Sequence, residues 1–138
     1  MAPELADATG APIWLHPADE PVWNLTHPHR RWDHDLADGQ EFTVGSVTLQ
    51  VIHTPGHAPG AVCLYAPELG CVFTGDTLFA GSCGRTDFAG GSMEVELQSL
   101  AKIAALPGDY EVYPGHEGST SLEYERRFNP YMLRPWDL

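Results

Sequence analysis

Apolar and polar residues alternate along the middle of the chain in the pattern that is typical of β-strands. Five short runs have this half-buried or buried character: residues 42–44, 47–52, 61–65, 71–74 and 110–113. The first two flank a Gly45-Ser46 turn, so they predict a hairpin with one buried face. We therefore expect a sheet built from the middle of the chain.

Helical spacing appears toward the C-terminus. Ser92 can cap a helix that runs to the residue before Pro107, and residues 121–128 predict a last short helix. Apolar residues recur in the longer helix at spacings of four, three and four, so they share one face: Met93, Leu97, Leu100 and Ala104. Glu94 and Glu96 lie near its positive N-terminal end, where acidic side chains are favourable.

The first forty residues are less regular. Residues 4–9 have helical character and end at Gly10, and residues 11–15 form an apolar run of strand length. No helix start precedes this segment, so we expect the sequence to begin inside an αβ unit. Residues 16–41 lack a steady period and predict a long surface connection with one short helix at residues 19–25.

Composition places the chain among globular domains. It has 138 residues, of which 43% are hydrophobic and 19% charged, and no internal repeat divides it. Seven basic against 19 acidic side chains give a net charge of −12, which disfavours nucleic acid and anionic membrane surfaces as partners. No apolar run approaches the roughly 18 residues needed to span a bilayer.

Cysteine usage favours a reducing compartment. Cys63, Cys71 and Cys83 are odd in number and form no Cys-x-x-Cys pair, so they predict small apolar side chains rather than disulfides or metal ligands. The first residues lack the basic and apolar regions of a signal peptide. A cytoplasmic location follows as an expectation.

Three segments share one form, in which an apolar strand leads through a glycine turn to a side chain that can bind metal. They end at His57, Asp76 and His116. If the three strands are parallel neighbours, or nearly so, these side chains converge on one rim of the sheet. Two imidazoles and a carboxylate suit zinc, iron or manganese. The alternative is that each residue only completes a turn.

Five motifs occur in a fixed order: His53-Thr-Pro-Gly-His57, Phe73-Thr-Gly-Asp76, Gly84-Arg-Thr-Asp87, Tyr113-Pro-Gly-His116 and Asn129-Pro-Tyr131. In order and spacing they resemble the metallo-β-lactamase superfamily, most closely its glyoxalase II-like hydrolases, which cleave hydroxyacyl-glutathione thioesters. The resemblance covers about residues 10–133. It implies an α/β (α+β) fold, the αββα sandwich, with residues 1–138 forming a single partial domain.

The resemblance also implies a site. His57 would bind a first metal ion, His116 a second, and Asp76 would bridge two zinc ions, with iron or manganese as other possibilities. A hydroxide held by both ions would attack the carbonyl of a small-molecule thioester derived from glutathione.

The family's His-x-His-x-Asp-His motif is not found in the sequence. Residues 27–34 have the right residue types but two residues too many before the aspartate, so they predict a polar loop. We therefore expect the C-terminal part of a superfamily domain with an incomplete site. Its uncovered sheet face and edge would then favour self-association.

Neighbouring residues have less specific roles. His53 is expected to support its loop rather than bind metal. Arg85 and Asp87 either pair with each other or contribute to the substrate surface. Glu117, directly after His116, is expected to face solvent.

Two other functions stay open. Gly84-Arg-Thr-Asp87 also resembles the persulfide dioxygenases, in which a single iron would use His57 and Asp76 but not His116. The chain could also be a non-catalytic fragment that acts through assembly or binding.

Overall fold

A mixed six-stranded sheet is the main element of the protein. The structure, a computed structural model, describes residues 2–133. The strands are β3 Glu41–Val44, β4 Val47–His53, β5 Val62–Ala66, β6 Cys71–Gly75, β9 Glu111–Pro114 and β10 Thr120–Ser121. Their order is β10-β9-β6-β5-β4-β3, and only β6 and β9 pair in parallel. The predicted strands and the α/β class are confirmed.

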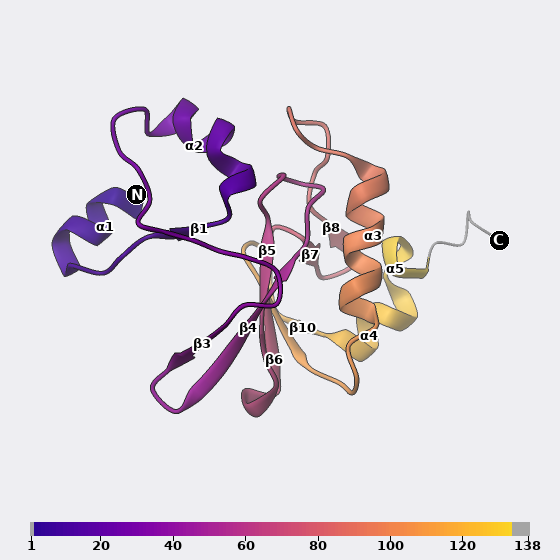
Figure 1. The fold of residues 1–138 in the computed structure, drawn as a ribbon. Coiled ribbons are helices and arrows are strands. Elements are labelled where there is room, and N and C mark those ends of the chain that lie inside the picture. The colour runs from indigo at the N-terminus through magenta and orange to yellow at the C-terminus, as the bar shows by residue number, and fades with distance from the viewer. Residues whose placement is uncertain (1, 134–138) are drawn as a thin grey trace.

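Helices cover one face of this sheet (Figure 1). They are α3 Met93–Ala104, α4 Leu122–Phe128 and α5 Pro130–Leu133. Leu100 and Ile103 of α3 are fully buried against Val72 and Val112 of the sheet. Each such aliphatic side chain contributes about 1.5–3 kcal/mol when it leaves water. The predicted α3 face is right for Leu97 and Leu100 but not for Met93, which begins the helix and is 41% exposed.

The N-terminal segment builds a second, smaller core away from α3 (Figure 1). Its elements are α1 Ala2–Thr9, β1 Trp14–Leu15, the 3₁₀ turn η1 Pro17–Asp19, α2 Glu20–Thr26 and β2 His34–Asp35. Trp23 and Trp32 are buried there, and their indole N–H groups donate to the Arg30 carbonyl and the Asp35 carboxylate, each at 2.6 Å. The expectation of a surface connection over residues 16–41 is therefore wrong in part, because these two indoles form a core.

The predicted strand at residues 11–15 is also shorter than expected. Only Trp14 and Leu15 pair, in parallel with His34 and Asp35, and neither strand joins the main sheet. None of the helices within residues 2–133 has the length and hydrophobicity that a membrane crossing requires.

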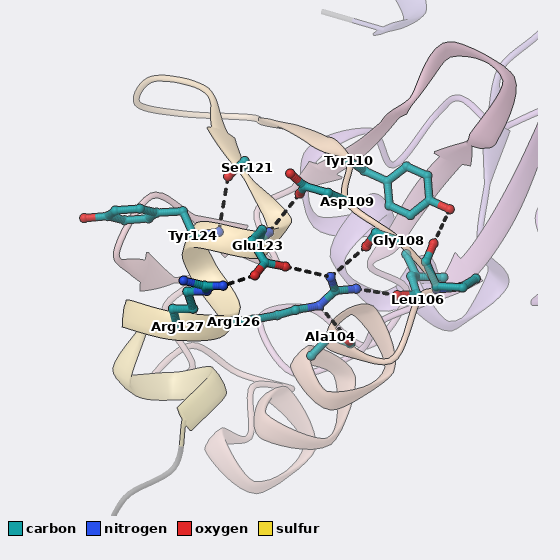
Figure 2. A network of polar contacts seen from close by, with 11 residues as sticks. Ala104, Leu106, Gly108, Asp109, Tyr110, Ser121, Glu123, Tyr124, Arg126 and Arg127 are labelled. Atoms are coloured by element: carbon teal, nitrogen blue, oxygen red, sulfur yellow. Dashed lines mark hydrogen bonds and ion pairs between the residues drawn. The ribbon is translucent and has the colours of Figure 1, made fainter.

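Arg126 of α4 closes the C-terminal end of α3 (Figure 2). Its guanidinium donates to the backbone carbonyls of Ala104 at 2.9 Å, Gly108 at 2.7 Å and Leu106. The Ala104 carbonyl at the helix end has no partner inside the helix, and the other two belong to the turn that follows it. A cationic side chain that binds all three therefore stabilises the helix end, this turn and their contact with α4.

We expect Arg126→Met to lower the free energy of unfolding by about 2–3 kcal/mol, because charged hydrogen bonds are lost and partly buried carbonyls are left unpaired. Arg127→Met is the matched control, since Arg127 is 69% exposed and pairs only with Glu123. Its effect should stay below about 1 kcal/mol. Urea unfolding of both variants checks the difference, and equal losses would contradict this role for Arg126.

The sheet face opposite α3 carries exposed aromatic residues. Leu64, Phe73 and Tyr113 are cross-strand neighbours, and the Phe73 and Tyr113 rings stack with centroids 5.6 Å apart. Both rings are about two fifths exposed. A contiguous apolar surface of this kind favours association.

We expect the average mass of the protein to rise with concentration in light scattering. Phe73→Lys should reduce that rise, whereas Tyr124→Lys, at an exposed aromatic residue on α4, should not. A constant monomer mass over the whole concentration range would contradict the expected self-association.

Candidate functional site

Three strands of the sheet end at the same edge. The carboxyl ends of β6 and β9 meet there because these strands are parallel neighbours. β4 runs in the same direction although β5 lies between it and β6, because both pairings with β5 are antiparallel. The turns that follow β4, β6 and β9 therefore bring His57, Asp76 and His116 together.

Asp76 lies between the two histidines. His116 Nδ1 is 2.8 Å from Asp76 Oδ1, and His57 Nε2 is 3.5 Å from Oδ2. The turn after β9 has a glycine for a steric reason, since a Cβ on Gly115 would lie 2.9 Å from Asp76 Oδ1. A side chain at this position would push the carboxylate away from His116.

The hydrogen bond of His57 defines its tautomer. His57 Nδ1 is 2.7 Å from the carbonyl oxygen of Arg85, and a carbonyl only accepts, so Nδ1 carries the proton. The other ring nitrogen, Nε2, lies 3.5 Å from Asp76 Oδ2. Two ligands of one tetrahedral zinc ion, each about 2.0–2.1 Å from it, are about 3.3 Å apart. The pair therefore fits two donors to one cation.

The donors form pairs rather than a larger cluster. His57 and His116 contact different oxygens of Asp76. Within residues 2–133, no three His, Cys, Asp or Glu side chains are grouped so that they could hold a metal ion. The two imidazoles and the carboxylate between them are residue types that bind metal ions. Together they form only part of a ligand set.

A cleft of about 260 Å³ opens over these residues, lined by His57, Asp76, Phe79, Arg85, Phe88, His116 and Glu117. Phe88 contacts the His57 ring and Phe79 the His116 ring, both edge to face with centroids 5.9 Å apart. The two phenylalanine rings therefore form walls beside the imidazoles. A larger cavity of about 460 Å³ beside Trp14 and Phe42 has no titratable side chain in its lining and offers no such chemistry.

Arg85 and Asp87 pair with each other beside the cleft. The guanidinium donates to both Asp87 oxygens, at 3.0 and 2.7 Å, and lies 4.5 Å over the Phe88 ring. This pairing lowers the pKa of Asp87 and raises that of Arg85. Arg85 also lines the cleft, whereas a contribution of either residue to a substrate surface stays a prediction.

Two further expectations concern single residues. His53 does not line the cleft; its Nε2 donates to the Pro59 carbonyl at 2.8 Å, within its own loop. Glu117 is exposed as expected, but it also lines the cleft, and its φ of 67° is in the left-handed region that disfavours side chains. Sequence reasoning missed this contribution to the rim.

The thiols are unsuited to ligation or catalysis. Burial raises the pKa of Cys63 to about 11 and that of Cys83 to about 12, so both remain protonated at neutral pH. Cys71 is also buried, and burial raises its pKa. The expectation that the cysteines act as small apolar side chains agrees with these environments.

Glu96 lies in the first turn of α3, near the positive helix end as the sequence predicts. The backbone of Gly56 packs against it and buries it fully, which the sequence does not indicate. Within residues 2–133, neither of its carboxylate oxygens has a hydrogen-bond partner. Burial raises the pKa of Glu96 to about 8, although nearby N–H groups of His57 and Gly84 lower it slightly without forming well-aligned bonds.

We expect the free energy of unfolding to decrease as the pH rises from about 5 to about 8. The folded protein keeps the Glu96 proton up to about pH 8, whereas the unfolded chain releases it near 4.5, so rising pH favours unfolding. Glu96→Gln should flatten this part of the pH profile. Glu94→Gln, at an exposed residue of the same helix, should leave the pH profile unchanged. A slope that survives in Glu96→Gln would contradict the assignment to Glu96.

Comparison with known proteins agrees with this arrangement. The model of the metallo-β-lactamase superfamily matches residues 2–116. An uncharacterized protein of Mycobacterium leprae is 37% identical over 152 residues, covering 95% of this chain and 69% of that protein. A hydroxyacylglutathione hydrolase of Brucella anthropi is 52% identical over 89 residues, which cover 64% of this chain but only 34% of the enzyme.

A solved structure shares both fold and sequence. TTHA1623, crystallised in a di-iron-bound form, superposes with a TM-score of 0.82 at 36% identity, over 94% of this chain and 68% of that one. The fold of this chain thus occurs in a family with solved members. The chain belongs to the metallo-β-lactamase superfamily.

Proposed function

We propose that the protein is a metal-dependent hydrolase of the glyoxalase II-like type, acting on a hydroxyacyl thioester derived from glutathione. The observation that carries the proposal is that each oxygen of Asp76 is faced by a different imidazole, His57 on one side and His116 on the other. The superfamily consists generally of metal-dependent hydrolases, and the Brucella hydrolase supports the thioester substrate class.

The residues present would act mainly by positioning. One or two divalent ions, zinc or iron, would supply a water of lowered pKa and polarise the thioester carbonyl. Asp76, His57 and His116 would hold these ions, and the Arg85 carbonyl would keep the His57 ring oriented toward the site. Phe79 and Phe88 would limit water at the cleft. The leaving group is a thiolate, which needs little protonation.

A second candidate is an oxidation of a glutathione persulfide at a single iron held by His57 and Asp76. It is favoured by the direct hydrogen bond from His116 Nδ1 to Asp76 Oδ1, at 2.8 Å, which gives His116 a role as partner of the carboxylate instead of ligand. The di-iron form of a similar protein shows that iron occurs in this family.

We expect His57→Ala and Asp76→Ala to lower kcat/KM for hydroxyacyl-glutathione hydrolysis by about 100-fold or more, because each removes a metal donor. The zinc- and iron-loaded protein are assayed separately, with bound metal counted. His29→Ala, at an exposed histidine of the N-terminal segment, is the control and should retain activity.

His116→Ala separates the two candidates. A two-metal hydrolase should lose activity, whereas a single-iron oxidase should keep oxygen consumption on a glutathione persulfide. Hydrolysis unaffected by His57→Ala or Asp76→Ala would contradict the proposed site. No turnover of either substrate with either metal would favour a non-catalytic protein.

A further inference from the structure

The loop that carries His57 is held firmly on the side of α3. This loop, residues 54–61 between β4 and β5, is called the ligand loop below. Ser92 N donates to the Gly56 carbonyl at 2.8 Å, and Ser99 Oγ donates to the Pro55 carbonyl at 2.6 Å. These bonds fix the first half of the loop, before His57.

The second half of the loop is held by the N-terminal segment. Asp19, at the end of η1, accepts a hydrogen bond from Gly60 N through Oδ1 at 2.6 Å. A Cβ on Gly60 would lie 2.5 Å from Asp19 Cγ. The φ of Gly60 is outside the left-handed region, so glycine is needed here for space and not for its backbone conformation.

A ring contact supports the same junction. The His16 ring stacks on the His53 ring with centroids 4.1 Å apart and planes 10° from parallel. His16 Nδ1 accepts from Ala18 N at 3.1 Å, which fixes the orientation of the ring within η1. Burial, and then the proximity of His53, lower the pKa of His16. Residues 16–19 therefore contact His53, the strand residue directly before the ligand loop, and Gly60 near the end of the loop.

We propose that Asp19 is a positioning residue for His57. Gly60 is three residues from His57, and its bond to Asp19 joins two parts of the chain that are 41 residues apart. With the first half of the loop held by α3, this bond determines where the second half lies and so directs the His57 ring between the Arg85 carbonyl and Asp76. The inference rests on the proposed function only in taking His57 as a site residue.

The test follows the His57 ring by NMR in the metal-free protein, so that its outcome is independent of catalysis. In the wild type we expect the Nδ1–H tautomer and slow exchange of the Gly60 amide. Asp19→Ala should give a mixed tautomer and speed amide exchange roughly tenfold or more, because a charge-assisted hydrogen bond is lost. Asp19→Asn keeps an acceptor oxygen and should restore most of the wild-type behaviour.

Asp33→Ala is the matched control. Asp33 Oδ2 accepts from Ile13 N at 2.7 Å, so it makes the same kind of bond within the N-terminal segment but does not touch the ligand loop. It should lower thermal stability about as much as Asp19→Ala and leave the His57 signals unchanged. If Asp33→Ala changes the tautomer as strongly, the role assigned to Asp19 is wrong.

Gly60→Ala approaches the contact from the other side and leaves the N-terminal segment unaltered, so it serves even where Asp19→Ala does not fold. Its methyl group should displace Asp19 and reproduce the loss of the tautomer. In the Asp19→Gly background no side-chain atom is left to clash with, so Gly60→Ala should add less than about a twofold change. Effects that multiply in the double variant, or a wild-type His57 in Asp19→Ala, would overturn the proposal.

Discussion

The common direction of β4, β6 and β9 is the constraint on which the site depends. Hydrogen bonding in the sheet places the ends of three strands at one edge although they are up to about 60 residues apart in sequence. The turns beyond them must then be narrow. A Cβ at Gly84 would overlap the Asp76 carbonyl and one at Gly115 would crowd the Asp76 carboxylate, so glycine at both positions allows the backbone to approach Asp76. The absence of side chains at these two positions leaves room for the imidazoles to reach the Asp76 carboxylate.

Two buried glutamates show how differently the fold treats the same kind of side chain. Glu125 of α4 accepts hydrogen bonds from Gly81 N, Thr120 Oγ and Asn129 Nδ2, at 2.8–2.9 Å. It thereby anchors the hairpin of β7 Leu78–Phe79 and β8 Ser82–Cys83, which supplies the Phe79 wall of the cleft. Glu96 is equally buried, but its carboxylate has no hydrogen-bond partner within residues 2–133. The hydrogen-bonded Glu125 therefore stabilises one wall of the cleft, whereas the unpaired Glu96 lowers stability beneath the ligand loop.

Local pattern was sufficient wherever neighbouring residues decide the structure. The strands follow from alternation, α3 from its Ser92 cap and Pro107, and the cluster of His57, Asp76 and His116 from three similar turns. Contacts between distant residues were not accessible in this way. The indoles of residues 16–41 gave no periodic signal, the burial of Glu96 depends on a loop 40 residues earlier, and the pairing of Asp19 with Gly60 spans 41 residues. Each of these depends on packing that only the assembled fold creates.

The backbone and the side chain of Arg85 have separate roles at the site. The carbonyl accepts from His57 Nδ1 and sets the ring that faces Asp76. The guanidinium pairs with Asp87 and lies over Phe88, which in turn contacts the edge of the same ring. A substitution of Arg85 removes the contacts of the guanidinium directly but keeps the backbone carbonyl. The identity of the residue therefore shapes the cleft wall, while the orientation of the imidazole depends on where the glycine-rich backbone before it runs.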